Sequence, residues 1–259
     1  MNEIMAIYTI WKREGIRYIR DKARIFSTLL QPLMFLVIFG AGLGATLNQG
    51  SFGIDFMKFM YPGIIAMNVM GIAFFSTVST VWDREFGFLK EILVAPVSRT
   101  SIVVGKILGA VTIASTQALL LLVLAPFMGI ALHTLIVVKL FFFMMLLAFA
   151  ISGMGLLIAS MMKTTESFSI IMQVLIFPMF FLSGAFFPLT GVPGWMTALS
   201  RINPLTYGVD GMRRIILNGI PAELADRLLV FPLRTNILIL LIFSVVMISA
   251  AALAFNRRA

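Results

Sequence analysis

The sequence predicts an all-α membrane protein with six transmembrane helices, and three observations lead to this fold class. Of the 259 residues, 60% are hydrophobic and only 12% are charged, whereas soluble domains carry about 25% charged residues. Apolar runs long enough to cross a bilayer recur along the chain. The charged residues gather between these runs. The predicted spans are 26–47, 57–81, 107–128, 135–161, 168–189 and 235–256, in one membrane domain over residues 1–259.

The positions of the basic residues predict the orientation of the chain. Lys and Arg collect on the cytoplasmic side of membrane proteins, and most of the 20 Lys and Arg residues fall in cytoplasmic segments if the N-terminus is inside. Six spans return the C-terminus to the same side. We therefore expect a multi-pass protein of the cell (inner or plasma) membrane with both termini cytoplasmic. The net charge of +9 then reflects topology and anionic lipid, and no nucleic-acid partner is expected.

Residues 1–24 are predicted to form an amphipathic helix in the membrane interface. Aromatic and aliphatic residues recur at helical spacing on one face, and arginines form a stripe on another. These residues are Ile4, Tyr8, Trp11, Tyr18 and Ile19 on the first face and Arg13, Arg17, Arg20 and Arg24 on the second. The alternative is a charged tail that only sets the topology.

Several classes of chemistry are not favoured by this sequence. There is no cysteine, and the one histidine, His133, lies beside a predicted outer turn, so no metal site is expected. No predicted span has Asp or Glu near its centre, which disfavours an ion-driven carrier or an aspartyl protease. Gly105-Lys106 lacks the first glycine and the hydroxyl of a phosphate-binding loop. We predict a non-enzymatic transport subunit with no catalytic residue and no bound cofactor.

A charge-dense helix is predicted over residues 83–96, between the second and third spans. Phe86 and Leu89 share an apolar face, Asp83 is expected to cap the helix start, and Pro96 to end it. Ser98 or Thr100 can cap the next helix. The predicted topology places the segment in the cytoplasm, where it could pass force from a soluble partner into the spans. The alternative is a surface helix that only closes a loop.

Residues 190–232 are predicted to hold two short outer helices at the membrane surface. The segment is too charged to cross a bilayer by itself and too apolar for a disordered loop. Trp195, Leu199 and Ile202 share one helical face. Asn203-Pro204 is expected to separate the two helices.

Two stretches resemble a known family. REFGFLKEILVAPVSRTSIVVGK, residues 84–106, resembles the signature of type-2 ABC (ABC-2) exporter permeases, and SRINPLTYGVDGMRR, residues 200–214, is similar to the segment before the last span in that family. The resemblance extends to the order of the amphipathic start, the six spans, the loop helix and the outer helices. One departure lies in the loop helix, where relatives often have Gly-Thr-Leu-Glu and this chain has Gly87-Phe88-Leu89-Lys90.

The resemblance implies half of an ATP-driven exporter. Two copies of the permease would pair, and two separate ABC ATPase subunits would dock below them and hold the ATP and Mg. The residues that the resemblance assigns to ATPase coupling are Arg84, Glu85, Phe86, Leu89, Glu91, Pro96 and Arg99. Those of the outer-loop motif are Asn203, Pro204, Tyr207, Asp210 and Arg213.

The substrate path is expected between the two copies, along polar residues at membrane depth. The candidates are Asn68, Thr112, Thr116, Gln117 and Gln173, which could instead only bond helices together. The spans contain Tyr61 and almost no other residue that suits sugars. A hydrophobic or amphipathic substrate, such as a drug or lipid, is therefore preferred to a polysaccharide or lipid-linked glycan. A membrane docking or assembly protein without transport activity remains a further alternative.

Overall fold

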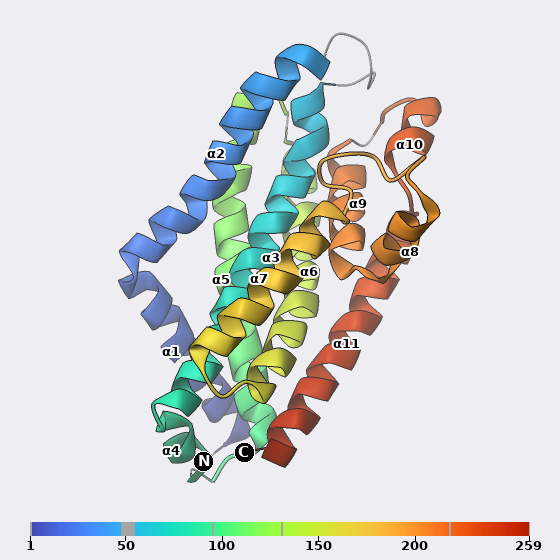
Figure 1. The fold of residues 1–259 in the computed structure, drawn as a ribbon. Helices are drawn as coiled ribbons and strands as arrows, with labels where there is room; N and C mark the ends of the chain where they lie inside the picture. The colour runs from blue at the N-terminus through green and yellow to red at the C-terminus, as the bar shows by residue number, and fades with distance from the viewer. Residues whose placement is uncertain (1, 48–54, 95, 131, 218, 259) are drawn as a thin grey trace.

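The computed structural model describes residues 2–47, 55–94, 96–130, 132–217 and 219–258, and within these ranges the fold is all-helical (Figure 1). The long helices are α2 (Lys22–Leu47), α3 (Phe56–Glu85), α5 (Arg99–Leu122), α6 (Thr134–Met161), α7 (Thr165–Phe181) and α11 (Leu233–Arg258). The N-terminal helix is α1 (Glu3–Arg20), and the short elements are α4 (Phe88–Val94), the 3-10 turn η1 (Ala125–Met128), α8 (Gly194–Ile202), α9 (Pro204–Ile216) and α10 (Ala222–Leu228).

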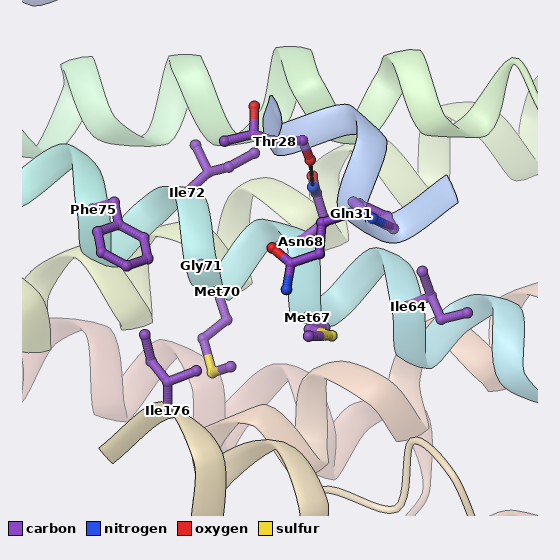
Figure 2. Close-up of a pocket in the computed structure, with 11 residues that line it drawn as sticks. Thr28, Gln31, Ile64, Met67, Asn68, Met70, Gly71, Ile72, Phe75 and Ile176 are labelled. Atoms are coloured by element: carbon purple, nitrogen blue, oxygen red, sulfur yellow. Dashed lines mark hydrogen bonds between the residues drawn. The ribbon is translucent and has the colours of Figure 1, made fainter. Parts of the chain in front are cut away.

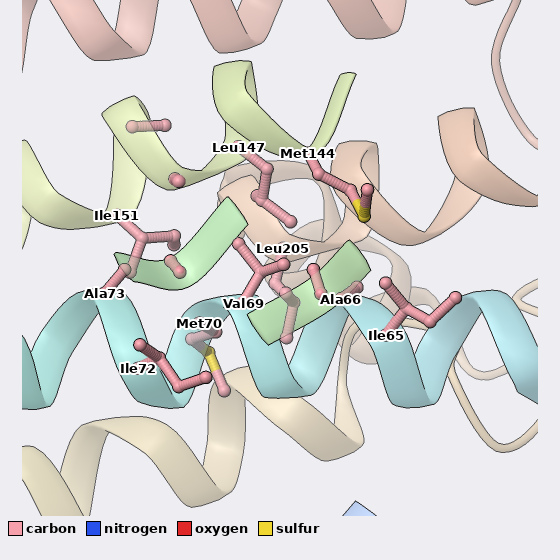
Figure 3. Packing of buried hydrophobic residues seen from close by; sticks show 14 of the residues in the cluster. Ile65, Ala66, Val69, Met70, Ile72, Ala73, Met144, Leu147, Ile151 and Leu205 are labelled. Atoms are coloured by element: carbon pink, nitrogen blue, oxygen red, sulfur yellow. The ribbon is translucent and has the colours of Figure 1, made fainter. Parts of the chain in front are cut away.

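Helix α3 forms the centre of the bundle. It is surrounded by α2, α5, α6, α7 and α9, and most of its residues are buried. Figure 3 shows its aliphatic side chains, Val69 and Ala73 among them, packed towards Leu147 and Ile151 of α6 and Leu205 of α9. Glycines bring the helices close together: a Cβ on Gly155 of α6 would lie 2.8 Å from Thr77 Oγ1 of α3.

Among the described residues, five helices are long and apolar enough to cross a bilayer: α2, α3, α5, α6 and α11. The predicted all-α membrane fold is thus confirmed, while the count of six spans stays a prediction. The helix in the place of the fifth predicted span, α7, has 17 residues and ends at Phe181, not at 189. At 1.5 Å per residue it is about 25 Å long, slightly less than the hydrocarbon core.

The N-terminal amphipathic segment forms the separate helix α1, which meets α2 at an elbow. Helix α1 ends at Arg20, and the Asp21 side chain accepts a 3.0 Å hydrogen bond from the backbone N–H of Arg24, at the start of α2. Helix α1 packs along α5, where Gly105 lies against Ile10 and Gly109 against Glu14. Its aliphatic residues Ile4 and Ile19 remain exposed, as expected for a helix at the membrane interface.

The helix predicted over 83–96 is divided in the structure. Asp83 does not cap it, because α3 continues through Asp83 to Glu85. The chain then turns at Gly87, whose φ of 79° favours glycine, before α4. The next helix, α5, begins at Arg99 and not at 107, and Ser98 caps it by accepting a hydrogen bond from the N–H of Ser101. The predicted cap at Ser98 is therefore confirmed.

The outer segment contains three short helices where two were predicted, because α10 follows the turn after α9. Asn203 separates α8 from α9 as expected and accepts a 3.0 Å hydrogen bond from the N–H of Leu205. Trp195, Leu199 and Ile202 lie exposed on α8. Helix α9 is not at the surface: it is buried between α3, α6 and α11.

Candidate functional site

Helix α4 presents the candidate docking surface at one end of the bundle. The start of α1 and the end of α11 lie at that same end (Figure 1). Beside α4, Phe86 is 80% exposed, and its last residue, Val94, is 85% exposed. Leu89 points inward and is buried in the core. Leu89 and the partly buried Ile92 thus anchor the helix in the core, while Phe86 and Val94 remain exposed to a partner.

Arg84 and Glu85 tie the end of α3 to the turn between α6 and α7. The Arg84 guanidinium donates to the backbone oxygens of Ser160 and Met162, at 2.7 and 2.8 Å. The Glu85 carboxylate accepts from the N–H of Thr165 at 2.9 Å and from its hydroxyl. Both side chains therefore position the base of α3. The other predicted coupling residues lie around α4: Glu91 and Pro96 are exposed, and Arg99 is partly exposed at the start of α5.

Glu3 joins the first turn of α1 to the first turn of α5. Its carboxylate accepts hydrogen bonds from the Ser101 hydroxyl at 2.5 Å, the Ser98 hydroxyl at 2.8 Å and the Ser98 N–H at 3.1 Å. These bonds, that from Ser101 foremost, hold the pKa of Glu3 below its ordinary 4.5. These bonds fix the start of α1 beside the start of α5, which follows α4 in the chain.

The Glu3 contact predicts that the start of α1 loosens in acid. Because the folded pKa is depressed, the stabilisation is complete above the ordinary pKa and is lost as the pH falls through the folded pKa. Hydrogen exchange of the first turn of α1 should therefore rise below about pH 4. Glu3→Gln should exchange at a rate that is independent of pH over this range, after correction for intrinsic exchange. An equally pH-dependent Gln variant would contradict the assignment.

A buried charge cluster, formed by Arg13, Glu14, Asp83 and Lys106, connects α1, α3 and α5. Asp83 Oδ2 accepts from Arg13 at 2.6 Å and from Lys106 Nζ at 2.7 Å. Glu14 Oε1 lies 3.0 Å from Arg13 and 3.6 Å from Lys106. Two cations thus balance two carboxylates. The sequence indicated Lys106 only as part of an incomplete phosphate loop; the structure gives it this pairing role.

Asn68 lies in an apolar groove between α2, α3 and α7, shown in Figure 2. The hollow measures about 130 Å³ and includes Met67, Phe75 and Ile176 in its lining. The Asn68 amide donates a 2.9 Å hydrogen bond to the backbone oxygen of Thr28. Its side-chain oxygen is buried and has no hydrogen-bond partner among the described residues. The wall of the groove therefore contains a buried amide oxygen whose hydrogen-bonding capacity is not used by the described residues.

The other candidate path residues lie elsewhere. Thr112, Thr116 and Gln117 line a second hollow, between α1, α2 and α5. Trp11 donates to the Thr112 hydroxyl at 3.0 Å, and Gln117 donates to the hydroxyls of Thr28 and Tyr18. Gln173 is exposed on α7. The structure thus does not bring the five candidates into one cavity.

The outer-loop motif holds the non-helical outer segments together. Asn203 donates to the Met179 oxygen at 2.6 Å, and the Tyr207 hydroxyl donates to the Arg201 oxygen at 2.6 Å. Pro204 begins α9. Asp210, which the sequence analysis assigned to the outer-loop motif, is buried in α9. It accepts from the N–H groups of Val230 and Phe231 and from the Asn236 amide.

Arg213 completes this outer arrangement. It is 3% exposed and donates to the backbone oxygens of Gly184 at 2.8 Å and Phe59 at 3.3 Å. Its guanidinium carbon lies 3.8 Å from the centre of the Phe59 ring.

The described part of the chain has no group of three or more His, Cys, Asp or Glu residues that could hold a metal ion.

Comparison with known proteins identifies the family to which this chain belongs. The family model described as ABC-2 type transporter matches residues 5–217, from α1 to the end of α9. This chain belongs to the ABC-2 type transporter family. As a family member it is similar to the transport permease ycf38 of Cyanophora paradoxa, with 33% identity over 81% of this chain and 73% of the relative.

Other relatives of this ABC-2 chain agree with that assignment. The inner membrane transport permease YadH of Escherichia coli strain K12 is 28% identical over 81% of this chain and 82% of its own length. Nodulation protein J of Rhizobium meliloti is 28% identical over 82% of this chain and 79% of its own. The resemblance inferred from residues 84–106 and 200–214 is therefore confirmed at the level of the family.

Proposed function

We propose that this chain is the membrane-spanning subunit of an ATP-driven exporter that moves a hydrophobic or amphipathic substrate out of the cytoplasm or inner leaflet. The single observation that carries the proposal is α4 with its surroundings, in a chain of the ABC-2 family. Exposed apolar side chains, Phe86 and Val94, lie on the segment between α3 and α5, and the adjoining ends of these two helices are hydrogen-bonded to the α6–α7 turn and to α1. A separate ABC ATPase would bind there and supply ATP and Mg, and this chain would bind no cofactor.

The connections around α4 support a transmission role. Ser98 couples α5 to α1 through Glu3, and Arg84 and Glu85 couple α3 to the α6–α7 turn. A displacement of α4 would therefore move several helices together. ATP binding must favour one arrangement of these helices over another for such movement to drive transport.

The groove at Asn68 supports a path for apolar or amphipathic substrates. Its lining is dominated by aliphatic, methionine and aromatic side chains. Helices α2 and α7 border it and expose apolar side chains such as Val37 and Val174. We propose that a second copy of this chain faces the groove and closes the path, with both termini in the cytoplasm.

A polysaccharide or lipid-linked glycan remains the alternative substrate. The one tyrosine of α3, Tyr61 in the second turn of the helix, is fully buried and donates its hydroxyl to the Leu121 oxygen at 2.7 Å, so it cannot stack on a sugar. This observation favours the apolar substrate. Transport by membrane vesicles with fluorescent lipid or dye, compared with labelled oligosaccharide, would separate the two.

The docking assignment is tested at Phe86. Phe86→Asp should weaken binding of the partner ATPase at least tenfold, because exposed aromatic anchors dominate protein interfaces. The complex reconstituted in vesicles should lose ATP-dependent export. Trp195→Asp is the matched control: Trp195 is also an exposed aromatic residue, 63% exposed, but it lies on α8, away from α4.

Three results would overturn the proposal. Equal binding of the ATPase by Phe86→Asp and the unchanged protein would remove the docking site from α4. Export by the purified chain in vesicles without an ATPase, driven by a proton gradient, would make it an ion-coupled carrier. A complex that hydrolyses ATP but exports nothing would support a docking protein.

A further inference from the structure

Two arginines at the α1–α2 elbow have no carboxylate partner in the described part of the chain. Arg17 of α1 and Arg24 of α2 line one polar hollow, together with Ser76 and Trp82 of α3. The Arg17 guanidinium carbon lies 4.4 Å from the centre of the Trp82 ring, and that of Arg24 lies 5.8 Å from the Tyr18 ring. Every ion pair found among the described side chains belongs instead to the charge cluster.

The hollow also contains a buried polar group without a partner. Ser76 is 9% exposed, and its hydroxyl has no hydrogen bond among the described residues. Glu14 borders the same hollow, but its carboxylate is already matched by Arg13 and Lys106 at 3.0 and 3.6 Å. Asp21 also lies at the elbow, and the charge of Arg17, Arg24 and Asp21 taken together remains positive. A buried hydroxyl and two arginines are the donors that an anionic oxygen needs.

A second, apolar hollow adjoins the first. It measures about 240 Å³ and is lined by Ile19, Ile25 and Leu120, among others. Tyr18 and Ile113 line both hollows, so the two are neighbours. A cationic hollow beside an apolar one fits a molecule with an anionic head and a hydrocarbon tail. Free phosphate would fill only the first.

We infer that the α1–α2 elbow binds the phosphate group of an anionic phospholipid from the leaflet on the α4 side, with an acyl chain in the hollow beside Ile19, Ile25 and Leu120. The polar hollow has room for about one water molecule, at about 10 Å³. The phosphate therefore lies at its mouth, between the guanidinium groups of Arg17 and Arg24. Ser76 reaches the phosphate through that water.

A lipid bound at this site would contribute to the connection between α1 and α2. Arg17 and Arg24 come from the two helices that meet at the elbow, so one phosphate bonded to both would hold the angle between them. The inference is independent of the transport proposal, because lipid binding is measured on the purified chain without an ATPase or a substrate.

The test is native mass spectrometry of the full chain released from detergent, titrated with phosphatidylglycerol or phosphatidylcholine. Concentrated ammonium acetate shortens the Debye length to about 3 Å at 1 M and suppresses unspecific surface attraction. We expect one phosphatidylglycerol to bind in preference to phosphatidylcholine. Arg24→Gln should weaken it about tenfold, since it removes a charge-assisted hydrogen bond. Arg20→Gln is the matched control, because Arg20 is an exposed arginine outside the hollow, and it should bind like the unchanged protein.

Further variants and ligands distinguish a specific phospholipid site from diffuse charge attraction, from fatty-acid binding and from binding of free phosphate. Arg17→Gln changes an exposed side chain and should also weaken binding, which covers the case in which Arg24→Gln does not fold. Equal losses in Arg17→Gln, Arg20→Gln and Arg24→Gln would overturn the site in favour of diffuse attraction. Oleate binding as tightly as phosphatidylglycerol would overturn recognition of phosphate. Inorganic phosphate binding as tightly as the lipid would overturn the assignment of a lipid.

Discussion

Lys106→Met is expected to lower the free energy of unfolding by about 3 kcal/mol, because it leaves a buried carboxylate short of a cation. Lys106 is almost fully buried and lies 2.7 Å from Asp83 and 3.6 Å from Glu14. Arg13 stays within 2.6 Å of Asp83, so the loss should fall at the low end of that for a broken buried pair. Methionine keeps the apolar stem of the side chain and removes the ammonium group with its charge and its hydrogen bonds to Asp83 and Ser79.

A double-mutant cycle tests this explanation. Asp83→Asn combined with Lys106→Met removes one charge of each sign and leaves Arg13 paired with Glu14. The double variant should be less destabilised than the sum of the single variants, by about 1–3 kcal/mol. Lys163→Met, at an exposed lysine in the α6–α7 turn, should change stability by less than about 0.5 kcal/mol. Additive single and double variants, measured by reversible unfolding in mixed micelles, would refute the coupling.

Gly63→Ala is expected to destabilise the chain by about 2 kcal/mol, through overpacking between α3 and the segment after α7. A Cβ on Gly63 would lie 2.7 Å from the Cβ and 2.8 Å from the Cα of Ala185. Backbone atoms cannot rotate away as a long side chain can. The cost of displacing this segment therefore exceeds the gain of about 1 kcal/mol from the better helix propensity of alanine.

Gly71→Ala, two turns further along α3, should have the opposite sign. No atom lies within 4 Å of a Cβ at Gly71, so only the helix propensity changes and the variant should gain up to about 1 kcal/mol. Thermal unfolding of both variants in the same detergent compares them directly. A stabilised Gly63→Ala would show that the segment at Ala185 yields without cost.

The local features of this fold could be predicted from the sequence because they depend on neighbouring residues. The apolar runs mark the long helices, and Asn203-Pro204 marks the break between α8 and α9. The cap at Ser98 was predicted, while the end of α3 was placed too early. The sequence analysis placed the start of a surface helix at Asp83. In the structure α3 continues through Asp83, Arg84 and Glu85, whose side chains bond to residues that are distant in the sequence. Those partners are Lys106, the Ser160 oxygen and Thr165.

The sequence by itself determined the membrane class, the family and the amphipathic character of α1, because hydropathy and short motifs are local properties. Only the tertiary structure decided that Lys106 meets Asp83, that Asp210 is buried, and that Arg17 and Arg24 share one hollow. The physical reason is that lipid and protein interior are equally apolar, so periodicity does not reveal which face of a spanning helix is buried. Helices α3 and α11 are both apolar, yet they differ in burial. In the most apolar stretch of α3, 83% is buried inside the protein, whereas in the apolar segment that includes α11 only 17% is buried.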